Sequence, residues 1–139
     1  MAPFHKGIQV NAYGNCEEIV LPNGLKKIEG DTFSNLDKLI KVTIPNSVTE
    51  IGTGTFKGCS SLETIVIPSS VETIGIWAFQ ETQLTEVTFP RGLKEILGGA
   101  FNNCSNLKNI VVPDSITSLS FGTFDANRQT TRAPTASSV

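Results

Sequence analysis

The chain has 139 residues and a net charge of −2 at pH 7, with 39% hydrophobic and 17% charged residues. These values are typical of one globular domain, and the chain is too short for two ordinary ones. They favour neither nucleic acid nor anionic lipid as a partner, and no apolar window approaches the ~18 to 20 residues of a membrane span.

The N-terminal arm, residues 1–15, has no apolar run of signal-peptide length behind its basic residues, so we expect no signal peptide in this sequence. Val10 and Tyr13 fall in the register of two columns that recur further along the chain. We therefore predict that the arm is a degenerate partial coil that caps the first repeat. His5, the only histidine, lies in this arm without a motif that would pair it with a nucleophile.

Five near-copies of one unit cover residues 16–124. Proline and phenylalanine each recur in steps of 22 or 23 residues, at Pro22, Pro45, Pro68, Pro90 and Pro113, and at Phe33, Phe56, Phe79, Phe101 and Phe124. A period of this length indicates stacked repeats, each of which buries its apolar side chains only against its neighbours.

Each unit is predicted to form one coil. In the third unit, "LETIVIPSSVETIGIWAF", Ile65 and Ile67 alternate with outward residues, which is typical of a short strand. Pro68 ends the strand, and the two residues that follow turn the chain. The return leg, residues 71–79, is expected to be extended or 3₁₀-like, because glycines recur in it. The sequence thus predicts a β-rich solenoid of short parallel strands with irregular return legs.

The fourth unit has lost one residue within "FQETQL", residues 79–84. We interpret this deletion as removing its residue from the corner column that contains Leu36, Cys59 and Cys104. It should shorten one corner and disturb the stack between the third and fourth strands.

The cysteines predict neither a disulfide nor a metal site. Cys59 and Cys104 share one corner position two strand spacings apart, roughly 9 to 10 Å, which exceeds the ~7 Å limit for a disulfide. Cys16 replaces a leading leucine near the other end, and no C-x-x-C spacing occurs. We expect three reduced thiols, with Cys59 and Cys104 in small buried positions.

The pattern L-x-x-I-x-I-P-x-S-V-x-x-I-G-x-x-A-F-x-x-C-x-x-L resembles the BspA-like, or TpLRR, class of leucine-rich repeats over residues 16–124. The resemblance implies a right-handed superhelix without a cofactor. It also implies a non-catalytic scaffold at the cell surface or secreted, because members are associated with adhesion to host matrix proteins, other cells or other bacterial surface proteins.

Outward positions of the strands form three columns. One column contains only valine and threonine, namely Val20, Thr43, Val66, Thr88 and Val111. The others are Glu18, Lys41, Thr64, Glu86 and Asn109, and Glu17, Ile40, Glu63, Thr85 and Lys108. β-branched residues suit any exposed strand, so the first column has a purely structural explanation. The alternative is a flat, mildly apolar strip that binds a protein, and if the chain binds one, we predict this sheet face.

Trp77 lies on the return leg, where two interpretations stay open. It packs against the adjacent return legs, or it is an exposed contact residue for a partner, since exposed tryptophan is enriched at interfaces. The binding residues that we predict are therefore Glu18, Lys41, Thr43, Thr64, Val66, Glu86, Thr88, Asn109 and Trp77.

No catalytic constellation stands out, and we predict that the chain is not an enzyme. Ser47, Ser70 and Ser115 share one repeat position with Gly24 and Gly92, which indicates turn residues rather than nucleophiles. The outward carboxylates lack a desolvating pocket that would raise their pKa.

Residues 125–139, "DANRQTTRAPTASSV", are polar and lack the leucine and strand of a sixth unit, so we predict a disordered tail or linker. No C-terminal cap is visible, although terminal coils of a solenoid normally need one. This favours an alternative function for the chain, self-association into a homo-oligomer through its open C-terminal end.

Overall fold

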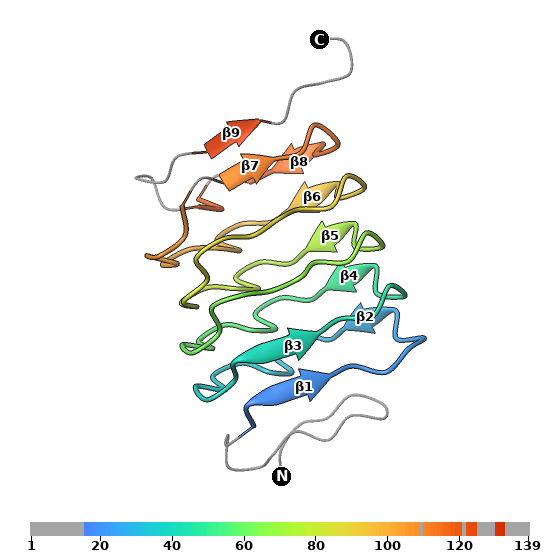
Figure 1. The fold of residues 1–139 in the computed structure, drawn as a ribbon. Helices are drawn as coiled ribbons and strands as arrows, with labels where there is room; N and C mark the ends of the chain where they lie inside the picture. The colour runs from blue at the N-terminus through green and yellow to red at the C-terminus, as the bar shows by residue number, and fades with distance from the viewer. Residues whose placement is uncertain (1–15, 109, 121, 125–129, 133–139) are drawn as a thin grey trace.

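The computed structural model describes residues 16–108, 110–120, 122–124 and 130–132, which wind into coils stacked along one axis (Figure 1). Each coil has a leading leg before its proline corner and a return leg after it. The leading-leg strands are β1 (Glu18–Val20), β3 (Lys41–Thr43), β7 (Ile110–Val112) and β9 (Thr130–Arg132). The return-leg strands are β2 (Lys27–Ile28), β4 (Glu50–Ile51), β5 (Thr73–Ile74), β6 (Glu95–Ile96) and β8 (Ser118–Leu119). Every strand pair is parallel, as predicted.

The leading-leg sheet is interrupted. β1 pairs with β3 and β7 pairs with β9, whereas the third and fourth units form no leading strand within the described chain. The fourth unit places the bulky Phe89 where its neighbours have Ile67 and Val112, and the ring packs edge-on against Phe101 at 5.5 Å. The third and fourth leading legs nevertheless keep two backbone hydrogen bonds, which Gln83 N and Thr85 N donate to the carbonyls of Leu62 and Glu63 at 3.1 Å. The deletion predicted a disturbance between the third and fourth strands, and the observed interruption is wider, since β3 of the second unit also lacks a strand partner in the third.

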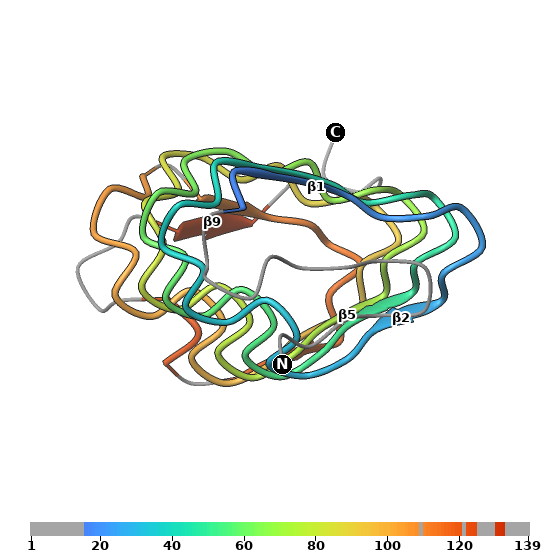
Figure 2. The same ribbon diagram turned by 90° about the horizontal axis from the view of Figure 1, so that it is seen from below.

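The return legs form the longer sheet, with five strands in the order β2-β4-β5-β6-β8. Sequence reasoning expected an extended or 3₁₀-like path here, and the structure shows a more regular ladder than on the leading side. Glycine is one reason, since a Cβ on Gly75 would lie 2.7 Å from the backbone of both Gly52 and Thr53. Without that atom, neighbouring backbones approach closely enough to pair. Figure 2, viewed along the stack, shows β1 and β2 on opposite sides of the coil.

Stacked phenylalanine rings fill one side of the core, confirming that the recurring phenylalanines face inward. Rings of Phe33, Phe56, Phe79, Phe101 and Phe124 follow one another with centroids 5.2 to 5.7 Å apart. The first four are essentially inaccessible to solvent, and Phe124 is partly buried at the end of the column. Neighbouring rings contribute about 0.5 to 1.5 kcal/mol per pair beyond their burial, so the column couples each coil to the next.

The prediction that the fourth unit lacks a residue in the cysteine column was wrong. Thr82 occupies that position, is buried, and places its Oγ1 3.3 Å from Sγ of Cys104. The missing residue instead belongs to the turn that follows Thr82. Cys59 and Cys104 are buried as predicted, and they and Cys16 carry free thiols.

The C-terminal segment differs from the tail predicted for residues 125–139. Within it, Thr130–Arg132 form β9, which pairs in parallel with β7 so that Ile110 lies beside Thr130. That step of 20 residues is shorter than the regular 22 or 23, and no leucine precedes it in residues 125–129, although Pro134 follows the end of β9 by two residues, as Pro22 follows the end of β1. The rest of this segment, and the predicted cap at residues 1–15 with His5, lie outside the described residues.

Candidate interaction surface

The outward side of the leading legs is a continuous exposed surface, which we call the leading face. Its described members are Glu17, Glu18, Val20, Ile40, Lys41, Thr43, Glu63, Thr64, Val66, Thr85, Glu86, Thr88, Lys108 and Val111. All of them are exposed, as the sequence predicted. Asn109, the remaining predicted member, lies outside the described residues.

Strand geometry explains the exposure of these side chains. In β1, Glu18 and Val20 point outward while Ile19 between them is buried, because successive side chains alternate across a strand. The register places Glu18 beside Lys41 and Val20 beside Thr43, so the columns run from coil to coil. The alternation continues through residues 64–66 without a strand assignment.

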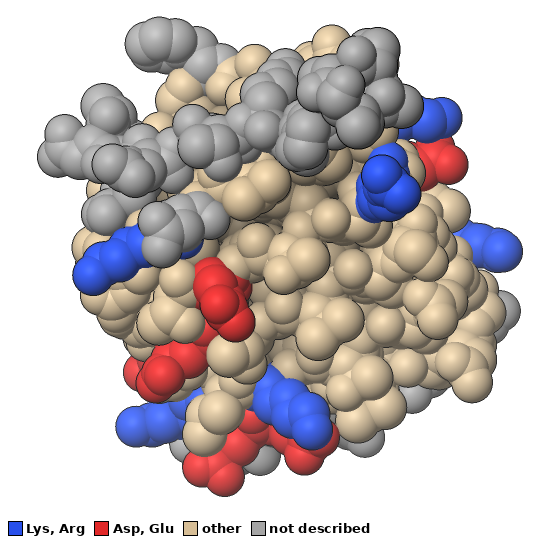
Figure 3. Space-filling model, turned by 45° about the horizontal axis from the view of Figure 1, so that its top comes forward, with Lys and Arg blue, Asp and Glu red and all other residues tan. Residues whose placement is uncertain are grey.

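The leading face carries most of the large apolar groups that the described chain exposes. Four of those seven residues lie on it, namely Val20, Ile40, Val66 and Val111. Val66, in the central unit, has 78% of its surface exposed, the highest value among them. Figure 3 shows a broad area with few charged side chains, bordered by acidic and basic groups. Exposed apolar groups with a charged border are typical of a protein contact surface.

Charges on the leading face are solvated. Lys41 Nζ lies 4.0 Å from Glu18 Oε2, and both side chains are more than half exposed. Such a pair contributes only about 0 to 1 kcal/mol to stability. These side chains therefore keep most of their capacity to pair with a partner's charges.

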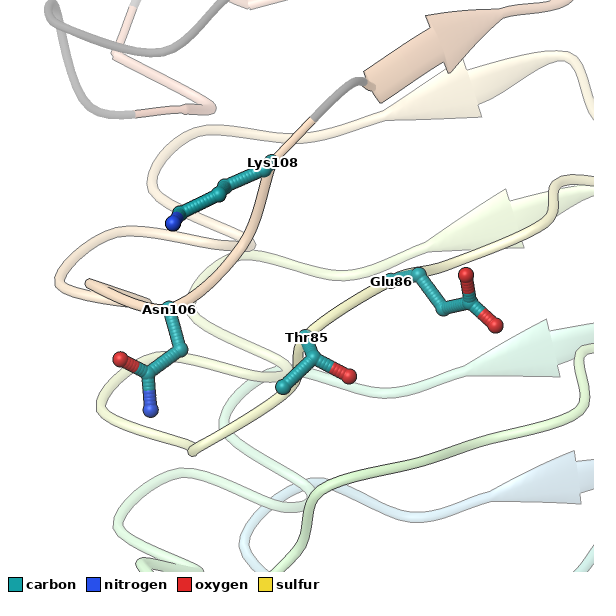
Figure 4. Close-up of a pocket in the computed structure, with 4 residues that line it drawn as sticks. All are labelled: Thr85, Glu86, Asn106 and Lys108. Carbon is teal, nitrogen blue, oxygen red and sulfur yellow. The ribbon is translucent and has the colours of Figure 1, made fainter.

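A depression of about 440 Å³ lies at the edge of the leading face, lined by Thr85, Glu86 and Lys108 of that face and by Asn106 (Figure 4). Asn106 Nδ2 donates a 2.6 Å hydrogen bond to Gln83 Oε1. The side chains of Glu86 and Lys108 point in opposite directions, so their charges do not converge on one point. Small-molecule sites are usually apolar clefts with convergent polar groups, and this depression has neither feature.

Trp77 lies elsewhere, at the corner after the return leg, so the structure does not bring it together with the leading face. Its side chain is 46% exposed, and Lys57 Nζ lies 5.0 Å from the ring centroid. The indole also covers Gly99, whose added Cβ would meet the ring within 3 Å. The ring thus packs on the next coil and still presents surface to solvent, and its role as a contact residue for a partner stays a prediction.

The backbone of Trp77 is in the left-handed region, with φ at 57°. Sequence reasoning missed this feature. The equivalent positions in other units are Asp31, Gly54, Gly99 and Gly122, all with positive φ. A bulky residue at a position that favours glycine costs roughly 1 to 2 kcal/mol of stability. A comparison of the residue types at equivalent positions of the repeats would have revealed the left-handed backbone.

Two serines that the sequence assigned to turns make turn hydrogen bonds in the structure. Ser47 Oγ accepts the N–H of Gly24, and Ser115 Oγ donates to the carbonyl of Leu93, so both act as turn residues. No group of three His, Cys, Asp or Glu side chains is placed to hold a metal within the described ranges. None of the elements described is a helix able to cross a membrane.

The repeats match a known family description, the BspA type leucine rich repeat region, in six copies over residues 6–131. The chain belongs to this BspA-type leucine-rich repeat family. The match extends on both sides beyond the five repeats counted from the sequence. Repeats of this family are typically non-catalytic scaffolds and commonly bind proteins.

Solved structures of other leucine-rich proteins share the fold. A T. pallidum leucine-rich repeat protein is 31% identical with a TM-score of 0.74, and the match covers 77% of this chain and 53% of that one. A leucine-rich cell surface protein from Faecalibacterium prausnitzii is 28% identical with a TM-score of 0.79, over 89% and 34% of the two chains. This chain thus spans about half the length of the first and a third of the second. No curated protein matches it.

Proposed function

We propose that this chain is a non-catalytic protein-binding or adhesion module that acts at a cell surface or outside the cell. The leading face is its binding surface. The observation that carries this proposal is the exposed strip of valine and threonine side chains centred on Val66, which the fold presents in regular register beside exposed charges. The cell-surface description of the Faecalibacterium prausnitzii protein supports the location.

Apolar contact would supply the binding free energy. Val20, Val66 and Val111 are about half exposed or more, and full burial of such a side chain contributes about 1.5 to 3 kcal/mol before losses of entropy. Thr43 and Thr88 extend the same strip between the valines. Together these five residues offer a partner a flat surface that needs no deep pocket.

Polar side chains beside the strip would set the orientation of the partner. Glu18, Lys41, Thr64 and Glu86 form the adjacent column, to which the sequence also assigns Asn109. Charges at the border of an interface mainly affect specificity and association rate. Trp77 is a separate proposed contact that would serve a partner reaching round the return-side corner.

Binding to a panel of purified host matrix proteins, measured by biolayer interferometry, tests this proposal. Wild-type protein should bind at least one of them saturably, and Val66→Asp should weaken that binding at least 10-fold, because it places a charge within the apolar strip. Thr53→Asp introduces the same charge at an exposed position outside the leading face and should leave binding unchanged. Equal affinities of the two variants would refute the leading face as the binding surface.

Self-association through the C-terminal end is a second candidate function. Leu119, in the last strand of the return-leg sheet, is 38% exposed, and Phe124 ends the ring column only partly buried. In the described structure β8 pairs with β6 alone, and an edge strand of this kind can pair with another chain. Leu119→Asp should then lower the mass of the oligomer in light scattering.

A further inference from the structure

We infer that the leading face binds a second copy of this chain, face to face, about a twofold axis parallel to the strands through the third unit. The inference rests on the proposed function and names a partner for the same surface. A rotation of 180° about such an axis keeps the strand direction and reverses the order of the coils. The first unit then faces the fifth, the second faces the fourth, and the third faces itself.

This axis places opposite charges across the interface. Lys41 of the second unit faces Glu86 of the fourth, and Glu17 of the first faces Lys108 of the fifth. Symmetry repeats each pair, so four attractive pairs border the contact. Glu63, in the third unit, faces its own copy and makes the only like-charged contact among the described charges that face one another.

Apolar groups also meet apolar groups about the same axis. Val20 faces Val111, and Val66, the most exposed valine of the strip, faces its own copy on the axis. Thr43 faces Thr88, so the mildly polar side chains pair as well. The strip therefore matches itself in both polarity and charge.

Neighbouring registers lack this match. If the axis moves half a coil toward the N-terminus, Glu18 faces Glu86 and the like charges repel. If it moves half a coil toward the C-terminus, Ile40 faces Lys108 and Glu63 faces Thr85, so neither pair unites opposite charges. Electrostatic complementarity of this kind selects one register over its alternatives.

The contact is small. Four strand spacings of ~4.8 Å and about five residues of ~3.3 Å each give a footprint on the order of 300 Å² per copy. Stable interfaces bury about 800 Å² per partner, so the dimer should be weak and form at high protein concentration. Salt should weaken it further, because the pairs that fix its register are exposed.

Sedimentation equilibrium of the full chain at low salt, from about 10 µM to about 1 mM, tests the dimer. Wild-type protein should dimerise within this range. Lys41→Glu and Glu86→Lys should each weaken the dimer at least 10-fold, because each creates two repulsive pairs. An equimolar mixture of the two variants should restore association, since every substituted side chain then faces an opposite charge. Lys94→Glu makes the same change on the return leg, where Lys94 pairs with Glu72 at 3.5 Å, and should have no effect.

Three results would overturn the inference. They are a wild-type monomer throughout the range, a mixture that does not recover, and a dimer weakened by Leu119→Asp but not by Lys41→Glu. The last result would indicate contact through the C-terminal end. A monomer whose matrix-protein binding is lost in Val66→Asp would overturn this dimer while the proposed function stands. A charge-dependent dimer that binds no matrix protein would support the dimer and refute adhesion to matrix proteins.

Discussion

Replacing Gly75 with alanine should destabilise the protein far more than the same replacement at Gly98. A Cβ on Gly75 would lie 2.7 Å from backbone atoms of Gly52 and Thr53 and 2.9 Å from the carbonyl oxygen of Ile51. Backbone atoms cannot move aside as a flexible side chain can, so the two coils must separate by roughly 0.7 Å to reach the ~3.4 Å of an ordinary contact.

That separation would cost about 2 to 4 kcal/mol of the free energy of unfolding. The hydrogen bond from Gly75 N to Ile51 O, now 2.8 Å, would lengthen to the limit of bonding, a loss of about 1 kcal/mol. Overpacking adds about 1 to 3 kcal/mol. At Gly98 the nearest atom to an added Cβ is 4.0 Å away, so alanine there should be neutral or stabilise by about 0.4 to 1 kcal/mol.

Urea denaturation followed by far-ultraviolet circular dichroism measures both variants. Neither glycine has the positive φ that favours glycine for conformational reasons, so the pair isolates the steric effect of the close coil contact. Equal denaturation midpoints for Gly75→Ala and Gly98→Ala would refute the view that close backbone approach on the return leg holds the coils together.

Two further predictions follow from the corner and the core. The φ of Trp77 is 57°, a left-handed backbone in which alanine is strained. Trp77→Gly should therefore be about 1 kcal/mol more stable than Trp77→Ala in urea denaturation. Equal stability of the two variants would contradict this prediction. Burial raises the pKa of the Cys59 thiol from 9.0 to about 12, so the unfolded chain ionises first and stability falls as the pH rises above about 9. The fall in urea midpoint between pH 8 and pH 10 should be smaller in Cys59→Ala, and an identical fall would contradict the assignment to this thiol.

The sequence predicted the architecture well because its interior residues are periodic. Buried positions such as Phe56, Phe79 and Phe101 must repeat at the coil period, since each side chain packs only against its equivalents above and below. The same periodicity placed the outward columns correctly, because a strand that buries Ile19 must expose Glu18 and Val20.

Features that depend on backbone contact between coils were harder to predict. The recurring glycines at Gly52 and Gly75 suggested an irregular path, whereas they allow the closest backbone approach in a regular ladder. β9 was missed because no leucine leads its unit and its step from β7 is only 20 residues, so Pro134 alone gave too weak a signal of a sixth repeat. Trp77 gives no local sign of a left-handed backbone, which becomes apparent only beside Gly99 in the next coil.

The position of the deletion in the fourth unit decides which side chains the leading face exposes. A one-residue loss within the strand would turn Glu86 and Thr88 inward, since side chains alternate at every residue. Because Thr82 keeps its place in the buried column and the loss falls in the turn after it, both residues stay exposed. The order of charges from Glu17 to Lys108 is then preserved across all five coils. In the proposed dimer this order of charges, which contributes nothing to the core, selects the partner. It depends on the register of the coils, which the repeat pattern alone does not give.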